Sequence, residues 1–231
     1  MRFQDAAKDA RAVVYAGIQA DPLVARVAAA LAEASPDQRV MARAVMTGET
    51  VDPDGWRAMF PTLFAAAPEG PTGAADLALS ETLLACALEV ADRGDEIRNQ
   101  LRGAIVEAVT ERLLAARVGA PSVRRERRIL FDGVRAEIHP YDVTVERDGA
   151  GEAYDCKWGA RGINADVLNQ LDDARTHAAD EDERLVVALV VFDAQLSCAV
   201  RLARQTAPTA GIGLVSLESL SSLAEAPGRA T

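Results

Sequence analysis

The chain has 231 residues, of which 49% are apolar and 26% charged, enough for the core of one large domain or two small ones. No run approaches the roughly 18 apolar residues of a membrane span, and charges near the N-terminus exclude a signal peptide, so we expect a cytoplasmic protein without a membrane segment. The net charge of −10 excludes a uniformly basic surface for nucleic acid but leaves room for a local basic groove.

Residues 1–93 carry helical patterns throughout and predict an all-α bundle of four or five helices. A first helix is expected over residues 5–19 and a long apolar helix over residues 74–91. Three helix starts between them are marked by a capping residue and a first-turn proline, at Asp21-Pro22, Ser35-Pro36 and Asp52-Pro53. No stretch has the spacing of a metal, phosphate or nucleophile site, so we expect this domain to bind a partner or substrate or to form a dimer interface.

Residues 94–231 mix strand and helix patterns and predict a separate α/β domain. A helix over residues 95–118 is followed by strand patterns at 122–131, 134–138, 141–147 and 152–158. Helices are then expected at 163–179 and 194–205, and strands at 185–192 and 212–217. Because residues 185–192 are apolar at consecutive positions, that strand is expected to be covered on both faces.

The stretch from Tyr141 to Lys157 contains the residues most suited to chemistry. It places Asp142 on one apolar strand and Asp155 with Lys157 on the next, and Asp148-Gly149 between them is a turn signal typical of a hairpin. Side chains alternate faces along a strand, so Asp155 and Lys157 point the same way while Cys156 points to the other side. Two carboxylates and one ammonium group are therefore expected to converge.

This combination suits hydrolysis of a phosphodiester by a magnesium ion, with Mn²⁺ as an alternative metal. Mg²⁺ prefers hard oxygen ligands and keeps several waters, so Asp142, Asp155 and the backbone carbonyl of Cys156 are sufficient candidates for the protein ligands. Lys157 would orient the attacking water or stabilise developing charge. Only two of the 25 basic residues are lysines, Lys8 and Lys157, and this indicates a role at position 157 that a forked guanidinium would not fill.

These residues resemble the PD-(D/E)xK nucleases, the superfamily of restriction endonucleases and archaeal Holliday-junction resolvases. In that family an acid on one strand is followed by a hairpin to a D/E-x-K strand, with one helix before and one after. Asp142 matches the first acid, although Pro140 is not immediately adjacent to it, and Asp155-Cys156-Lys157 matches the tripeptide. The resemblance covers residues 95–217 and implies a restriction-endonuclease-like core, a mixed sheet flanked by helices in the order α-β-β-β-α-β-α-β.

The resemblance also implies two further site residues and a substrate. Glu107, on the helix before the strands, matches the glutamate that completes the metal pocket in many members, and Glu111 is the alternative one turn later. Gln170 matches a glutamine on the helix that follows the tripeptide strand. The implied activity is Mg²⁺-dependent endonucleolytic cleavage of DNA, and homodimers are common in the family.

Four arginines close to the hairpin are candidates for DNA contact, Arg124, Arg125, Arg127 and Arg128. A solvated edge strand explains them equally well. Asp142 could likewise be a surface charge, and Asp155 with Lys157 a surface ion pair contributing under about 1 kcal/mol.

Two rival functions fit the same sequence. The first is a catalytically inactive protein that keeps the nuclease fold and uses its acidic surface, or the helical domain, to bind a protein partner. The second is an α/β enzyme with other chemistry, for which we expect an apolar pocket instead of an open groove.

Overall fold

The computed structural model describes the chain except residues 7–9, 66–70, 133, 136–138, 148–149 and 226–231. Two compact units make up the chain: a sheet unit of residues 1–10 and 110–231, and a helical unit of residues 11–109. The division falls inside helix α7 (Asp95–Val118), not near residue 94. The reason is that the helix serves both units: Arg102 donates to Met46 O at 3.0 Å in the helical unit, whereas Glu111 pairs with Arg125 in the sheet unit.

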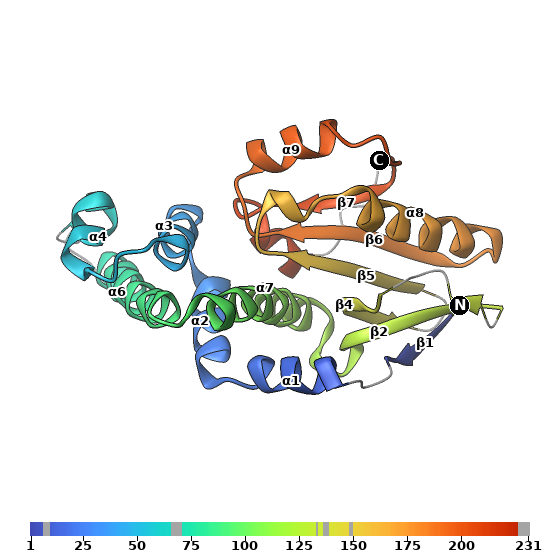
Figure 1. The fold of residues 1–231 in the computed structure, drawn as a ribbon, viewed down its shortest axis with the longest axis horizontal. Helices are drawn as coiled ribbons and strands as arrows, with labels where there is room; N and C mark the ends of the chain where they lie inside the picture. Colours follow the sequence, from blue (N-terminus) through green and yellow to red (C-terminus); the bar gives the residue numbers. More distant parts are fainter. Residues whose placement is uncertain (7–9, 66–70, 133, 136–138, 148–149, 226–231) are drawn as a thin grey trace. The chain divides into compact units, whose positions relative to one another are not determined.

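The sheet unit is built on a seven-stranded mixed sheet in the order β1-β2-β4-β5-β6-β7, with β3 paired to β2 (Figure 1). Neighbours from β1 to β5 are antiparallel, and β5, β6 and β7 are parallel. The strands are β1 (Arg2–Asp5), β2 (Val123–Phe131), β3 (Val134–Arg135), β4 (Tyr141–Arg147), β5 (Ala150–Lys157), β6 (Arg184–Val191) and β7 (Ile212–Val215).

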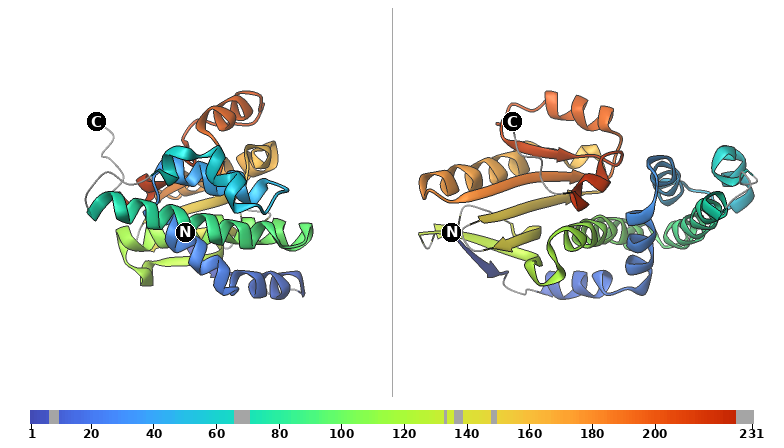
Figure 2. Two further views of the ribbon diagram at one scale, coloured as in Figure 1. Left: turned by 90° about the vertical axis from the view of Figure 1, so that its left-hand side faces the viewer. Right: turned by 180° about the vertical axis from the view of Figure 1, so that it is seen from behind.

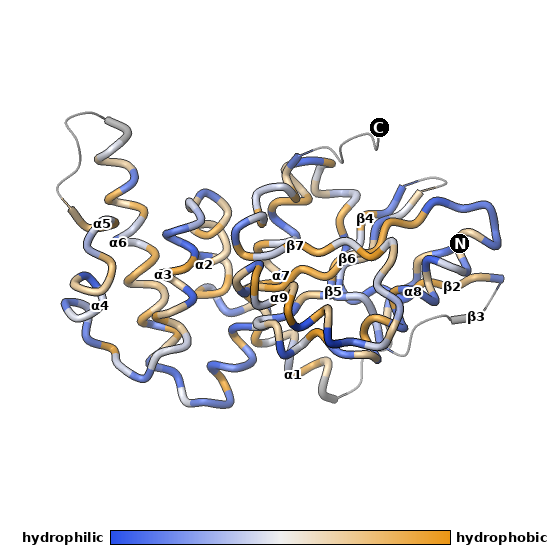
Figure 3. Tube along the Cα trace, turned by 90° about the horizontal axis from the view of Figure 1, so that it is seen from above, coloured by the Kyte–Doolittle hydropathy of each residue, from blue (hydrophilic) through white to orange (hydrophobic). Residues whose placement is uncertain are grey.

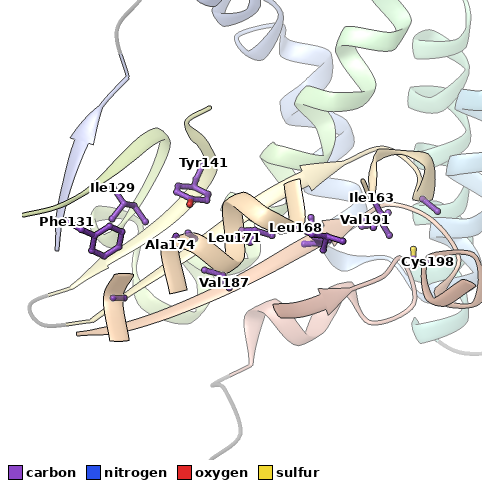
Figure 4. Close-up of a cluster of buried hydrophobic side chains, with 14 residues drawn as sticks. Ile129, Phe131, Tyr141, Ile163, Leu168, Leu171, Ala174, Val187, Val191 and Cys198 are labelled. Atoms are coloured by element: carbon purple, nitrogen blue, oxygen red, sulfur yellow. The ribbon is translucent and has the colours of Figure 1, made fainter. Parts of the chain in front are cut away.

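Helix α8 (Ala165–Asp180) supplies one wall of the sheet unit's core. Its side chains Leu168, Leu171 and Ala174 pack with Val187 and other apolar residues of the sheet (Figure 4). The apolar run along β6 is visible in Figure 3, and its second half is buried while Val186 near its start is exposed. The unit also contains α9 (Gln195–Ala203) and the short 3-10 helices η1 (Ala120–Ser122), η2 (Ala160–Gly162) and η3 (Leu220–Ala224).

The fold is α/β with a mixed sheet, as expected, but four strands, β2 to β5, lie between α7 and α8, where the predicted order had three. β4 and β5 pair as the predicted antiparallel hairpin, and the turn signal Asp148-Gly149 lies outside the described residues. The prediction of an all-α N-terminus was wrong for its first residues. Arg2–Asp5 form β1, an edge strand bonded to β2, and they do not lead into a helix beginning at residue 5.

The helical unit consists of helices whose starts follow the local capping chemistry. Asp21 accepts a hydrogen bond from Leu23 N at 2.8 Å, Ser35 and Gln38 form a capping box, and Asp52 caps the next helix. Helices α2 and α3 pack on α6 (Figure 2). The helices are α1 (Ala10–Gln19), α2 (Pro22–Glu33), α3 (Pro36–Thr47), α4 (Pro53–Met59), α5 (Pro61–Phe64), α6 (Pro71–Ala91) and the first part of α7.

Met41, Met46 and Trp56 are buried in the core of the helical unit, whereas Met59 is exposed. Among the described helices, none combines the length and the apolar character needed to cross a membrane.

Candidate functional site

The pairing of β2 with β4 brings two acidic residues together. Arg125 is opposite Val143 and Arg127 opposite Tyr141, so the register places Glu126 opposite Asp142. Carboxylate oxygens of Glu126 and Asp142 lie within 4.8 Å of each other, a spacing that two ligands of one cation can adopt. Glu126 has a left-handed backbone (φ 53°), which is uncommon for a residue other than glycine. Glu126 was not among the site residues predicted from the sequence, since it stands inside the arginine-rich run of residues 124–128.

Asp142 also fixes the geometry between β4 and β5. Its Oδ2 accepts a hydrogen bond from the backbone N–H of Cys156 at 2.6 Å. The Cys156 side chain is buried, with Sγ 3.6 Å from Thr110 Oγ1 on α7. The aspartate is therefore tied to the middle of the Asp155-Cys156-Lys157 tripeptide.

The charges of Asp155 and Asp142 both act on the ammonium group of Lys157. Its ammonium group forms an ion pair with buried Asp155, and 27% of its side chain is exposed. Burial lowers the pKa of Lys157, but the negative charges of Asp155 and Asp142 outweigh burial and hold that pKa above its ordinary value. Lys157 is consequently an ammonium group at neutral pH, able to donate hydrogen bonds and stabilise negative charge but not to act as a general base.

Glu107 lies on α7, one turn before Glu111, and only 5% of it is exposed. The Tyr15 hydroxyl donates to its Oε1 at 2.5 Å, and Gln19 Nε2 donates to its Oε2 at 2.7 Å. Two donors from α1 therefore hold this carboxylate. The alternative, Glu111, is engaged in an ion pair with Arg125. Glu107 belongs to the helical unit, whereas Glu126 and Asp142 both belong to the sheet unit and lie close enough to share a metal ion.

Gln170 on α8 directs its side chain at the backbone that leads into β4. Its Oε1 accepts from His139 N at 3.2 Å, and its Nε2 donates to His139 O at 3.1 Å. The Tyr141 hydroxyl adds a third bond, donating to Gln170 O at 3.3 Å. Gln170 thus anchors the start of the strand that carries Asp142, and it acts on the site through the backbone.

Replacing Gln170 with alanine is expected to lower the free energy of unfolding by about 1–2 kcal/mol, because two hydrogen bonds to His139 are lost. Gln170→Glu keeps the acceptor for His139 N but sets a buried carboxylate against the His139 carbonyl, so it should lose at least as much. Urea unfolding of the two variants beside the parent measures the difference. Equal midpoints for parent and Gln170→Ala would show that the anchor contributes nothing.

The arginines proposed for DNA contact differ in their surroundings. Arg125 pairs with Glu111, and Arg127 pairs with Glu146 at 2.6 Å and also with Asp5. Arg124 is exposed and donates to Val123 O at 3.1 Å, whereas Arg128 is partly buried. Carboxylates therefore balance the charge of Arg125 and Arg127, and exposed Arg124 is better placed to meet a phosphate.

The fold and the site together define an α/β protein with an acidic group on adjacent strands of a mixed sheet. No family model, curated protein or solved structure matches the chain.

Proposed function

We propose that the protein is a metal-dependent nuclease that hydrolyses DNA phosphodiester bonds with Mg²⁺, or with Mn²⁺ as a substitute. The observation that carries the proposal is the juxtaposition of Glu126 and Asp142 on β2 and β4 with the Asp155–Lys157 pair on β5. Carboxylate oxygens are the ligands these hard cations prefer. A protonated amine beside them matches the negative charge that develops on a phosphate under attack.

Each residue has a distinct role in this proposal. Asp142 and Glu126 would hold the cation, with Asp155 and the Cys156 carbonyl as ligands from β5. Such an ion supplies charge neutralisation on the phosphate and a more acidic bound water. Buried Asp155 holds the ammonium group of Lys157, and Gln170 holds the backbone that precedes Asp142.

A catalytically inactive protein of the same fold, acting as a scaffold or protein-binding module, is the second candidate. It is favoured by the net charge of −10 and by the carboxylate partners of Arg125 and Arg127, which reduce the attraction for DNA. On this alternative the helical unit is the proposed surface for a protein partner or a second copy of the chain.

Plasmid and linear DNA incubated with the protein, with and without Mg²⁺ or Mn²⁺, distinguish the two candidates. We expect metal-dependent cleavage that Lys157→Ala lowers by about 100-fold or more, because a charge-stabilising donor is lost from the site. Lys8→Ala is the matched control, since it removes the only other lysine. Absence of cleavage with either metal would favour the scaffold, and equal activity of Lys157→Ala and the parent would disprove the assigned site.

A further inference from the structure

The turn that connects β5 to α8 lies directly against the side chain of Lys157. A Cβ atom added to Gly162 in η2 would lie 2.8 Å from Lys157 Cδ and 2.9 Å from both Cβ and Cγ. Separations under 3.0 Å essentially never occur for real Cβ atoms. The three atoms are the root and middle of the lysine side chain and not its free end. A rotamer change would move Cγ and Cδ, but Cβ is fixed by the backbone, so relieving the whole contact also requires a small backbone shift.

The turn itself is held at both ends. Ala160 N donates to Asp193 Oδ2 at 2.9 Å, and Arg201 Nε on α9 donates to Ile163 O at 2.9 Å. Two further backbone bonds, from Gly162 N to Gly159 O at 2.9 Å and from Ile163 N to Ala160 O at 3.0 Å, close the turn internally. Because these bonds hold the turn in place, a substitution at Gly162 is expected to displace the side chain of Lys157 as well as to strain the turn.

The backbone of Gly162 gives no other reason for a glycine. Among the described glycines, only Gly119 and Gly211 have the left-handed conformation that favours this residue. The backbone of Lys157 is also held in place. Its carbonyl accepts a hydrogen bond from Phe192 N at 2.8 Å, which fixes it to the segment that follows β6. The missing side chain at position 162 thus leaves space that the stem of Lys157 occupies.

We propose that Gly162 and its pinned turn are positioning elements that set the rotamer of Lys157 and aim its ammonium group at Asp155. The catalytic consequence rests on the proposed nuclease function, whereas the structural consequence does not. Gly162→Ala is expected to displace the lysine, to lower kcat for Mg²⁺-dependent cleavage of linear duplex DNA by about 10–100-fold and to leave KM unchanged, because misplacement of a catalytic group by about 1 Å costs rate more than binding.

The position of the lysine can be followed without any activity. A chain labelled with ¹³C,¹⁵N-lysine gives signals from two residues only, and Lys8→Arg assigns them. In Gly162→Ala we expect shifted Lys157 side-chain signals and loss of the nuclear Overhauser contact between Lys157 methylenes and residue 162. Gly94→Ala is the matched control, because nothing lies within 4 Å of a Cβ built there. Arg201→Met provides a second variant that loosens the turn without filling the space.

The outcomes separate the two proposals. Displaced Lys157 signals in Gly162→Ala, with kcat lowered and KM unchanged, support the positioning role. If the parent protein cleaves no DNA but Gly162→Ala still displaces the Lys157 signals, the role of Gly162 in placing the lysine is supported and the proposed nuclease activity is refuted. Unchanged Lys157 signals in both Gly162→Ala and Arg201→Met, or an unchanged kcat despite a displaced lysine, would overturn the inference.

Discussion

Replacing Asp142 with asparagine is expected to lower kcat for DNA cleavage about a thousandfold and to weaken Mg²⁺ binding. A bound metal ion contributes several kcal/mol of charge stabilisation in the transition state, and each ~1.4 kcal/mol corresponds to a factor of ten in rate. Asp142 shares its surroundings with the carboxylate of Glu126 and with the positive charge of Lys157. Its loss therefore removes a ligand from the centre of the proposed site.

The choice of asparagine separates catalysis from folding. The Asp142→Asn side chain keeps an oxygen that can accept from Cys156 N, so the urea midpoint should stay close to that of the parent. Asp142→Ala lacks this acceptor and should lose stability as well, by about 1–3 kcal/mol. Asp173→Asn, on an exposed position of α8, is the control for the same chemical change. If Asp142→Asn cleaves DNA as fast as the parent and binds Mg²⁺ with the same affinity in calorimetry, Asp142 is not a metal ligand.

The parts of the structure that the sequence predicted well are those determined by neighbours in the chain. The helix starts at Asp21, Ser35 and Asp52 follow from side chains that bond to backbone N–H groups two or three residues away. The β4–β5 hairpin likewise joins consecutive segments, and along β4 the apolar residues Tyr141, Val143 and Val145 alternate with polar ones.

Structural features that depend on residues far apart in the chain could not be predicted from local sequence patterns. β1 is a short edge strand with mostly exposed residues, so it has no alternating apolar pattern, and only its pairing with β2 makes it a strand. Glu126 joins Asp142 only through the register of β2 against β4, two strands separated by β3 in the chain. That register was the one signal that could have identified Glu126, because it follows once Val143 is aligned with Arg125.

The arginine run illustrates the same limit for charge. Its composition indicates a basic groove, yet Glu111 on α7 and Glu146 on β4 approach two of its guanidinium groups. The sequence shows how many charges a segment carries. The oppositely charged side chains that the fold places beside them determine the electrostatic potential that remains to attract a ligand.

Breaking the buried ion pair at the end of α7 is expected to destabilise the sheet unit strongly. Arg117 pairs with Glu152 on β5, with only 9% and 12% of the two side chains exposed. The Tyr154 hydroxyl donates to the same Glu152 oxygen. Burial, followed by this hydrogen bond to Glu152, raises the pKa of Tyr154, so it remains a neutral donor. Burial lowers the pKa of Arg117, but the bonds and charges of Glu152 and Tyr154 together outweigh burial and raise that pKa, so the guanidinium stays charged.

Glu152→Gln is therefore expected to lower the free energy of unfolding by about 3–5 kcal/mol, because the charge of Arg117 stays buried without its counter-ion. Glu152→Leu combined with Arg117→Met should recover most of that loss, since two apolar side chains of similar volume remove both charges. Glu89→Gln, in the exposed Arg26–Glu89 pair, is the control and should leave the urea midpoint unchanged. If Glu152→Gln is no more harmful than Glu89→Gln, solvent reaches Arg117 and the pair does not behave as a buried one.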